Sequence, residues 1–164
     1  MAKAASDRLV AEILTSQNPA AGVAVVADLP TLSAVTATDR PRRVLFSAMK
    51  NEGPFVLEWI AYHKAIGFDE IVICSNPSTD GMEQVLEALA AAGEITHLRA
   101  VVPAGDSPQI HAVRAFQRDV GFRDGDWYLW LDADEFLNVH VGDRTVMALI
   151  TAMQHRQCAL INWR

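Results

Sequence analysis

The sequence predicts an α/β fold with a mostly parallel sheet that is covered by helices on both faces. From Arg43 onward, short apolar runs alternate with stretches of helical period, which is the pattern of parallel strands joined by crossover helices. One run, Trp127–Leu131, has only apolar or aromatic residues, as expected of a strand that is buried on both faces. This run leads directly into Asp132, Asp134 and Glu135, so the sheet is predicted to end there in a polar edge.

The individual elements rest on local signals along the chain. Apolar runs between turn residues predict strands at 44–49, 71–74, 95–98, 128–132 and 158–163. Apolar residues at helical spacing predict helices that begin near residues 54, 80, 107 and 146. Because strands and helices alternate in this order, the connections should be crossovers between parallel neighbours.

Two of the predicted helices have a recognisable start. Pro54 suits the first turn of a helix because the N–H that it lacks would have no partner there. The inward face of that helix is predicted to carry Phe55, Trp59, Tyr62 and Ile66. Asp80 and Glu83 have the spacing of a capping box at the start of the next helix, which gives Asp80 a structural alternative to a role in binding.

Residues 1–42 lack this alternation. We interpret them as an appended N-terminal segment and linker ahead of one domain at residues 43–164. Within the segment, Ala4–Thr15 has the pattern of a short amphipathic helix. The apolar run Gly22–Ala27 is too short for its period to distinguish a strand from a helix.

Composition excludes several classes of protein. A chain of 164 residues with 51% apolar residues has room for one sizeable core. The net charge of −6 argues against a nucleic-acid partner or an anionic membrane surface. Cys74 and Cys158 lie in apolar runs, where we expect them to pack as small hydrophobes and to form no disulfide or zinc site. We therefore expect a cytoplasmic protein, since no apolar run approaches the ~20 residues of a membrane-spanning helix; attachment to the cytoplasmic face of a membrane would need regions outside this chain.

The acidic cluster after the apolar strand is the candidate active site. Residues two apart on an extended chain point to the same side, so Asp132 and Asp134 can reach into one site. One or two carboxylates are enough to hold a hard divalent cation that also binds a substrate phosphate. The structural alternative is that an Asp here caps a helix or turns a loop. Phe136–Val139 has no helical period to be capped, which weakens that alternative.

Three predicted loops should meet at the carboxyl edge of the sheet, where ligands bind in open sheets of this kind. They are Asn51–Gly53, Ser75–Gly81 and Asp132–Glu135. Acidic and amide side chains in these loops suit a base, a ribose and a metal-neutralised phosphate, which together describe a nucleotide diphosphate. No glycine-rich phosphate loop follows the first strand, so NAD binding and a P-loop NTPase are disfavoured.

The motifs at this edge occur in the order found in a known family. They read Met49-Lys50-Asn51-Glu52, Glu58-Trp59 with His63, Ser75-Asn76-Pro77-Ser78-Thr79-Asp80-Gly81, Asp126-Trp127 and Leu131-Asp132-Ala133-Asp134-Glu135-Phe136. Over residues 43–164 the chain resembles family 2 type glycosyltransferases of GT-A fold, in the branch with an Asp-x-Asp-Glu-Phe motif.

The resemblance implies a Rossmann-like fold and transfer of a sugar from a UDP- or GDP-type donor. It implies Mn²⁺ or Mg²⁺ near Asp134, with Asp132 near the metal, the ribose or the sugar. The candidate donor-binding residues are Asn51, Glu52, Ser75, Asn76, Asp80 and Asp132. Many members hold the base with an Asp where this chain has Ser75 and Asn76, so the base is not specified.

Inverting members of this family place a carboxylate base well after the acidic motif. We therefore expect the domain to be incomplete at its C-terminus, with the base beyond Arg164, so that the 164 residues bind donor but transfer no sugar to a glycan, lipid or protein acceptor. Apolar surface near Leu160, Ile161 and Trp163 should then be exposed and favour self-association.

Two other functions fit part of the pattern. An aspartate-dependent phosphotransferase or phosphatase also carries Asp-x-Asp after an apolar strand, although usually the first strand of its domain. A non-catalytic nucleotide-binding module would keep the fold without the reaction. Outside the motif, we interpret His63 as a half-buried hydrogen-bonding residue, while Gln109 and His111 fit a phosphate contact and a solvated helix start equally well.

Overall fold

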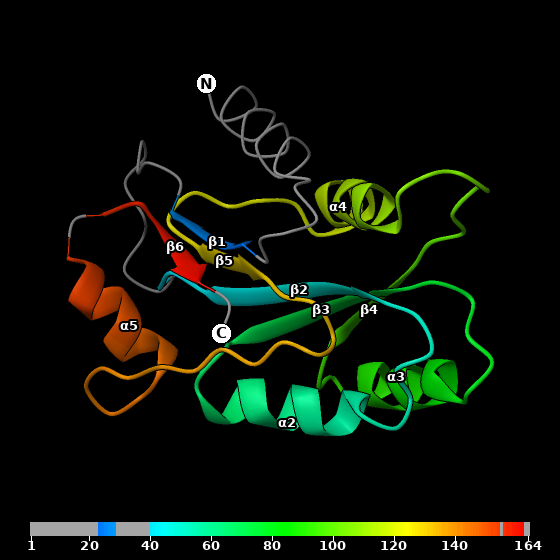
Figure 1. Cartoon of the computed structure of the whole chain (residues 1–164), viewed down its shortest axis with the longest axis horizontal. Helices are drawn as coiled ribbons and strands as arrows, with labels where there is room; N and C mark the ends of the chain where they lie inside the picture. Colours follow the sequence, from blue (N-terminus) through cyan, green and yellow to red (C-terminus); the bar gives the residue numbers. More distant parts are fainter. Residues whose placement is uncertain (1–22, 29–39, 155, 163–164) are drawn as a thin grey trace.

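The computed structural model describes residues 23–28, 40–154 and 156–162. Within these residues, one sheet has the strand order β4-β3-β2-β5-β1-β6 (Figure 1). The strands are β1 (Val23–Asp28), β2 (Arg43–Met49), β3 (Glu70–Ser75), β4 (Thr96–Arg99), β5 (Trp127–Trp130) and β6 (Cys158–Asn162). Strands β4, β3, β2 and β5 are parallel, whereas β1 runs antiparallel to both β5 and β6. The predicted α/β fold with a mostly parallel sheet is confirmed.

Helices cover both faces of the sheet. They are α2 (Val56–Ala65), α3 (Met82–Ala91), α4 (Pro108–Asp119) and α5 (Val146–Met153). Figure 1 shows α2 and α3 on one side of the parallel strands and α4 on the other. The N–H of Val146 donates to the carbonyl of Ile66, which ties the start of α5 to the end of α2.

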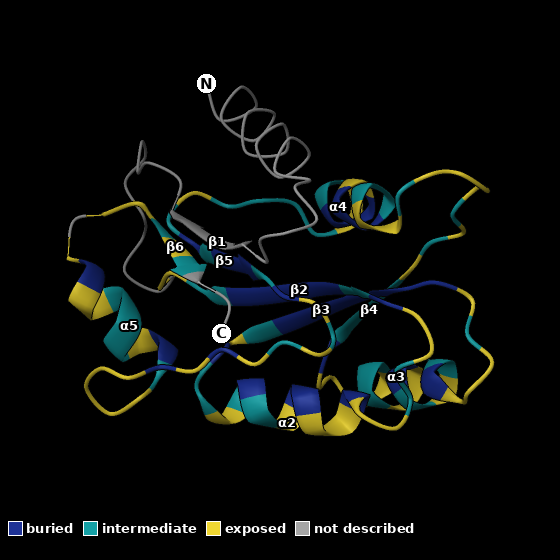
Figure 2. Cartoon of the chain, in the orientation of Figure 1, coloured by how far each residue is buried: buried dark blue, intermediate teal, exposed yellow. Residues whose placement is uncertain are grey.

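Strand β2 divides the core into its two layers. Alternate side chains of a strand point to opposite faces, so Leu45 and Met49 pack toward α2 and α3, while Val44 and Phe46 pack toward α4. Figure 2 shows that the buried residues of α2 lie on the side that faces the sheet. Trp59 and Phe116 are fully buried, one in each layer. Each large buried side chain contributes about 1.5–3 kcal/mol, so the two layers together hold the parallel strands in place.

The sheet extends into the segment that we interpreted as a linker. Val23–Asp28 forms β1, whose Val26 lies opposite Leu129 on one side and Ala159 on the other. The short apolar run is therefore a strand, and the prediction that residues 1–42 are only an appended segment differs from the structure here. The local pattern did not show this because β1 gains its partners from strands about 100 and 135 residues later in the chain. The helix predicted at 4–15 lies outside the described residues.

The buried face of α2 differs from the predicted one. The helix begins at Val56, and the Glu52 carbonyl accepts hydrogen bonds from the N–H groups of Phe55 and Val56, so Pro54 lies in the turn before the helix. The buried face carries Val56, Trp59, Ile60 and His63. Phe55 is 60% exposed. Trp59 is buried as predicted, and Ile66 packs against the core. His63 joins the buried face because the later segment 135–137 crosses the helix, which periodicity alone cannot show.

In the last strand, β6, exposed and half-buried residues alternate over residues 158–161. Leu160 is 75% exposed, as predicted, but Ile161 is half-buried against the core. Cys158 is exposed, so the prediction that it packs as a small hydrophobe is wrong, whereas Cys74 in β3 is buried. Trp163 lies outside the described residues, and self-association stays a prediction. In the part of the chain that is described, no helix has the length and apolarity needed to cross a bilayer.

Candidate functional site

The candidate site lies where the strand order reverses. The chain proceeds from β2 to β3 and β4 on one side, and β5 then returns to the opposite side of β2. Because β2 and β5 are parallel, their carboxyl ends meet at one edge, and such a reversal opens a crevice there. A cleft of about 610 Å³ occupies this position. It is lined by Ala48, Glu52, Phe55, Glu58, Gln109, Asp132, Ala133, Asp134 and Phe136.

The acidic motif forms a tight turn at the end of β5. The N–H of Glu135 donates to the Asp132 carbonyl at 3.1 Å, and the N–H of Asp132 donates to Glu135 Oε2 at 3.0 Å. The carboxylate of Glu135 therefore closes the turn. Asp132 and Asp134 are both exposed, and both line the cleft. Trp130 Nε1 donates weakly to Asp132 Oδ1 at 3.3 Å.

Asp80 and Asn51 join the two neighbouring loops to each other. Asp80 Oδ2 accepts a hydrogen bond from the Gly53 N–H at 2.6 Å, and its Oδ1 accepts one from the Met82 N–H at 3.1 Å. The Gly53 N–H is the main reason that the pKa of Asp80 lies below its ordinary value. Asn51, in the left-handed region with φ of 58°, accepts the Thr79 N–H at its Oδ1. These contacts assign structural roles to both residues.

Gly53 permits the close approach of these loops. A Cβ at this position would lie 2.9 Å from Asp80 Oδ2, which is closer than a carbon and an oxygen can pack. The predicted capping box does not form. The cap of α3 is Gly81, which receives no side-chain capping hydrogen bond, and Glu83 Oε2 pairs with Arg99 at 3.3 Å. Asp80 lies one position before the cap and binds the first turn of the helix through its Oδ1.

Ser75 and Asn76 do not line the cleft. Ser75 is buried and its Oγ lies 2.8 Å from His97 Nε2, while the Asn76 N–H donates to the Met49 carbonyl. Ser75 instead lines a second hollow of about 300 Å³ between the ends of β3 and β4. Of the six predicted donor-binding residues, Glu52 and Asp132 line the main cleft. Sequence spacing placed all six at one edge but could not show which side chains the fold buries or pairs.

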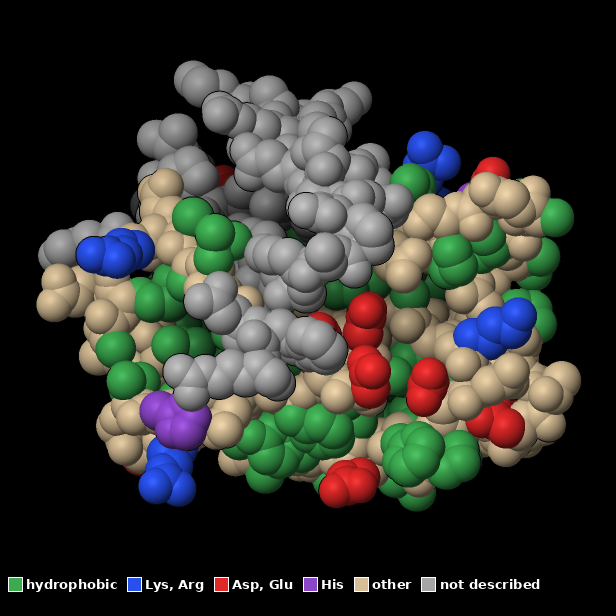
Figure 3. All heavy atoms as spheres, viewed as in Figure 1, with side chains coloured by type: hydrophobic (Ala, Val, Ile, Leu, Met, Phe, Trp, Pro, Cys, Tyr) green, Lys and Arg blue, Asp and Glu red, His purple; other side chains and the backbone are tan. Residues whose placement is uncertain are grey.

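The cleft carries negative charge without compensation. Within the described ranges, no Lys or Arg forms an ion pair with Glu52, Glu58, Asp132 or Asp134. Burial raises the pKa of Glu52, and the nearby charges of Asp134 and Asp80 raise it further. Figure 3 shows acidic side chains gathered near the middle of one face, with basic side chains toward its margins.

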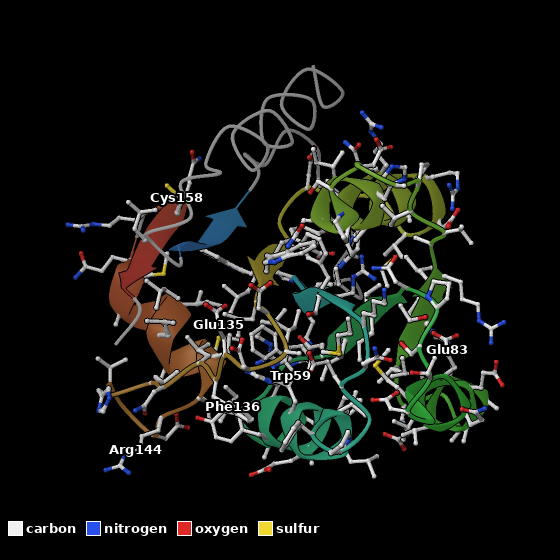
Figure 4. The ribbon with its side chains drawn as sticks, turned by 45° about the vertical axis from the view of Figure 1, so that its right-hand side comes forward. Trp59, Glu83, Glu135, Phe136, Arg144 and Cys158 are labelled. Carbon is white, nitrogen blue, oxygen red and sulfur yellow. The ribbon has the colours of Figure 1, made fainter. Side chains whose placement is uncertain are left out.

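Helix α2 fixes the backbone that follows the acidic turn. Trp59 Nε1 donates to the Glu135 carbonyl at 2.9 Å, and the Tyr62 hydroxyl donates to the Leu137 carbonyl at 2.9 Å. Figure 4 shows Trp59 next to the segment that carries Glu135 and Phe136. The sequence did not reveal this contact, because the partners are 75 and 76 residues apart and the acceptors are backbone carbonyls.

His63 completes this set of contacts. Its Nδ1–H donates to the Trp59 carbonyl at 2.8 Å, and its Nε2 accepts the Leu137 N–H at 3.3 Å. Burial lowers the pKa of His63 to about 4, so the ring is neutral at neutral pH and each ring nitrogen has one partner. The prediction of a hydrogen-bonding role is confirmed, although the residue is fully rather than half buried.

Gln109 and His111, at the start of α4, differ in their position relative to the cleft. Gln109 lines the cleft, and its Oε1 accepts a hydrogen bond from Ser107 Oγ at 3.0 Å. His111 pairs with Asp106 outside the cleft. Phe55, Glu58 and Phe136 line the cleft but were not predicted as site residues. The sequence signal for Phe136 was its place at the end of the Asp-x-Asp-Glu-Phe motif.

A metal at this site would need ligands from a bound molecule. Across residues 40–154 and the other described segments, no group of three or more His, Cys, Asp or Glu residues could hold an ion. Asp132 and Asp134 supply carboxylate oxygens, which suit Mg²⁺ or Mn²⁺, but two residues leave most of an octahedral shell open. The donor set fits a cation that is shared with substrate phosphates and water.

One relative in sequence is a glycosyltransferase. No family model matches the chain. Over 105 residues the chain is 29% identical to a family 92 glycosyltransferase of Ricinus communis, and the match covers 63% of this chain but only 18% of that protein. This similarity agrees with the coarser part of the predicted resemblance, whereas assignment to family 2 stays a prediction.

Two solved structures resemble part of this chain. The structure of TarS from S. aureus matches with a TM-score of 0.49 and 17% identity, over 68% of this chain and 19% of that one. The mannosyltransferase PcManGT from Pyrobaculum calidifontis, in complex with GDP-Man and Mn²⁺, matches with a TM-score of 0.45 and 23% identity, over 64% of this chain and 31% of that one.

Proposed function

We propose that this chain carries the donor-binding site of a metal-dependent glycosyltransferase of GT-A type. The reaction would transfer a sugar from a nucleotide diphosphate to an acceptor hydroxyl. One observation carries the proposal: Asp132 and Asp134 lie exposed on a cleft at the reversal of strand order, and no described Lys or Arg neutralises them. The sequence similarity to a family 92 glycosyltransferase supports the same function.

Asp134 is the proposed principal metal contact, and Asp132 is proposed to contact the metal or the sugar nucleotide. Both side chains are free of strong partners, so neither must break an ion pair to bind. The cation would neutralise the charge that develops on the departing diphosphate. Because the proposed ligand set has only two carboxylates, we expect weak binding of the cation alone and tighter binding when a diphosphate adds its oxygens.

Glu52, like Glu58, adds further negative charge to the same cleft. Its pKa is raised by burial and by Asp134 and Asp80, so its charge is disfavoured until a cation arrives. This arrangement favours binding of a metal–nucleotide complex over binding of a free anion. A nucleotide diphosphate without metal should be repelled by the same residues.

Calorimetric titration tests this proposal. We expect the chain to bind UDP or GDP in the presence of Mn²⁺ or Mg²⁺ and to lose this binding in EDTA. Asp134→Asn is nearly isosteric and should weaken cation-dependent binding by about tenfold or more, as expected for loss of one charged ligand. The matched control is Asp124→Asn, which removes the same charge from an exposed turn at the opposite edge of the sheet.

Two results would contradict the proposal. Equal binding of the nucleotide in EDTA and in Mn²⁺ would remove the metal from the site. Equal losses in Asp134→Asn and Asp124→Asn would show that net charge, rather than a specific ligand, governs binding.

A further inference from the structure

Two phenylalanine rings line the acidic cleft and remain exposed to solvent. Phe136 is 42% exposed and Phe55 is 60% exposed. A single exposed apolar side chain needs no explanation. These two differ from scattered surface residues because they share a concave site with Glu52, Asp132 and Asp134. The cleft therefore combines flat apolar surface with hydrogen-bond acceptors.

Phe136 is held by hydrogen bonds on both sides in the chain. The carbonyl of Glu135, the residue before it, accepts from Trp59 Nε1 at 2.9 Å. The residue after it, Leu137, donates its N–H to His63 and accepts at its carbonyl from the Tyr62 hydroxyl. Since Trp59 and His63 are fully buried, they cannot move without disturbing the core. The backbone position of Phe136 is thus fixed by α2.

The ring itself is also oriented. Phe136 stacks on His63 with a centroid distance of 5.7 Å and an interplanar angle of 17°, and it meets Tyr62 edge to face at 5.2 Å. One face of the ring covers the buried imidazole, and the exposed part of the ring borders the cleft. Phe55 has no comparable ring contact among the described residues. Phe136 is therefore a preorganised surface, and Phe55 is not.

The chemistry of this surface matches a sugar ring. A hexose has a face of C–H groups that packs on an aromatic ring, and hydroxyls at its rim that donate to carboxylates. Phe136 follows Asp134 by two residues, so their Cα atoms lie within about 7 Å of each other. In a nucleotide sugar, the sugar is joined directly to the diphosphate. A diphosphate bound through a cation at Asp134 would place the sugar within reach of Phe136.

We infer that the exposed part of the Phe136 ring is the surface on which the sugar of the donor stacks, and that Trp59, Tyr62 and His63 are positioning residues for it. This inference rests on the proposed function, because it assumes that the cleft binds a nucleotide sugar. It goes further by separating the residue that contacts the sugar from those that contact the diphosphate.

The test compares donors with and without a sugar. The dissociation constants of UDP, UDP-glucose, UDP-N-acetylglucosamine, GDP and GDP-mannose are measured by calorimetry in Mn²⁺ for the wild-type chain and for Phe136→Leu. Leucine keeps an apolar side chain but has no flat face. We expect nucleotide-diphosphate binding to change less than about twofold and binding of the preferred nucleotide sugar to weaken about fivefold, the size of one aromatic contact.

Three further variants sharpen the comparison. Phe136→Tyr retains the ring and should restore sugar binding. Leu57→Ala truncates an exposed apolar side chain of α2 that does not line the cleft, and it should change neither dissociation constant by more than about twofold. Trp59→Phe keeps a buried ring but removes the donor to the Glu135 carbonyl, so it should weaken nucleotide-sugar binding more than nucleotide-diphosphate binding. A purely structural role of Trp59 would weaken both equally.

The outcomes separate this inference from the proposed function. Equal weakening of nucleotide and nucleotide-sugar binding in Phe136→Leu would overturn the stacking role while leaving the donor site in place. Unchanged sugar binding in that variant would overturn it too. If the wild-type chain binds no nucleotide under any condition, the proposed function fails and the inference fails with it.

Discussion

The two edges of the sheet use acidic residues in opposite ways. At the amino edge, Asp69, Glu70 and Asp126 are each paired with arginines from neighbouring strands and loops. At the carboxyl edge, Asp132 and Asp134 have no such partner among the described residues. The residue types are the same and the strands are the same. The difference lies in whether the fold places an arginine side chain beside the carboxylate.

Asp126 illustrates the amino edge. Its side chain is fully buried and accepts hydrogen bonds from the Arg42 N–H and Arg42 Nε, from Arg123 and from the Tyr128 hydroxyl. Burial alone would raise the pKa of Asp126, but the hydrogen bonds from Arg123 and Arg42 hold it below its ordinary value. This carboxylate joins the starts of β2 and β5, and its charge is compensated by Arg42 and Arg123.

The contrast shows which acids are structural and which are available to a ligand. A carboxylate with several internal donors gains nothing from an added cation, whereas exposed and mutually repelling carboxylates do. Asp80 belongs to the first kind although it lies at the carboxyl edge, because two backbone N–H groups already bind it. Proximity to the site is therefore a weaker criterion than the state of the hydrogen-bond partners.

The largest effect is expected at the amino edge. Asp126→Asn removes the charge of a buried carboxylate that accepts hydrogen bonds from Arg42 and Arg123, and the loss of several charge-assisted hydrogen bonds should cost about 3–5 kcal/mol. Urea unfolding monitored by circular dichroism measures this loss. The control Asp119→Asn breaks an exposed pair with Arg118 and should leave the unfolding midpoint nearly unchanged. Similar unfolding midpoints for the two variants would show that the charge of Asp126 does not stabilise the fold.

An intermediate effect is expected from His63, whose contacts hold the carboxyl edge. Its pKa of about 4 in the folded chain lies below the ordinary value of 6.5, so the unfolded state takes up the proton first as the pH falls. The contribution of the neutral His63 ring to the free energy of unfolding is fully present above pH 6.5. It declines between pH 6.5 and 4, by roughly 3 kcal/mol in total. The pH dependence of the unfolding free energy measures this decline.

The matched variant for this pH effect is His63→Gln, which should flatten the decline between pH 6.5 and 4. The pKa of His97 is also lowered by burial, but His97 is present in both wild type and His63→Gln. Its contribution therefore cancels when the two pH profiles are subtracted. The losses of Asp126 and Asp69 occur at lower pH, because their pKa values lie below 3.8. Identical pH profiles for wild type and His63→Gln would contradict the assignment of a neutral buried imidazole.

The smallest effect is expected from Glu52. Its pKa is raised in the folded chain, so its contribution to stability is present below pH 4.5 and is lost as the pH rises through the folded value. At pH 7 the charged form is therefore unfavourable, and Glu52→Gln should raise Tm by no more than about 2 °C. In differential scanning fluorimetry, the Tm difference between Glu52→Gln and wild type should disappear when UDP or GDP and Mn²⁺ are added. A lower Tm for Glu52→Gln without ligand would contradict repulsion in the cleft.

Local sequence patterns determined the parallel part of the fold. Strands β2, β3 and β5 and the helices between them follow from apolar runs and helical periods within single segments, and the acidic turn follows from its place after an apolar strand. The same patterns placed Asp132 and Asp134 on one site. These features depend on residues that are neighbours in the chain, so a sequence window contains the information that fixes them.

Tertiary structure alone decided which polar groups are satisfied and which are free. The position of β1 between β5 and β6, the burial of His63 under the segment 135–137, and the pairing of Ser75 with His97 each depend on partners distant in the chain. A side chain's hydrogen-bond partners and burial set its charge state and its availability to a ligand. Residue type and spacing could therefore nominate six donor-binding residues, but only the packed chain distinguished the two that line the cleft, Glu52 and Asp132, from those that hold the loops.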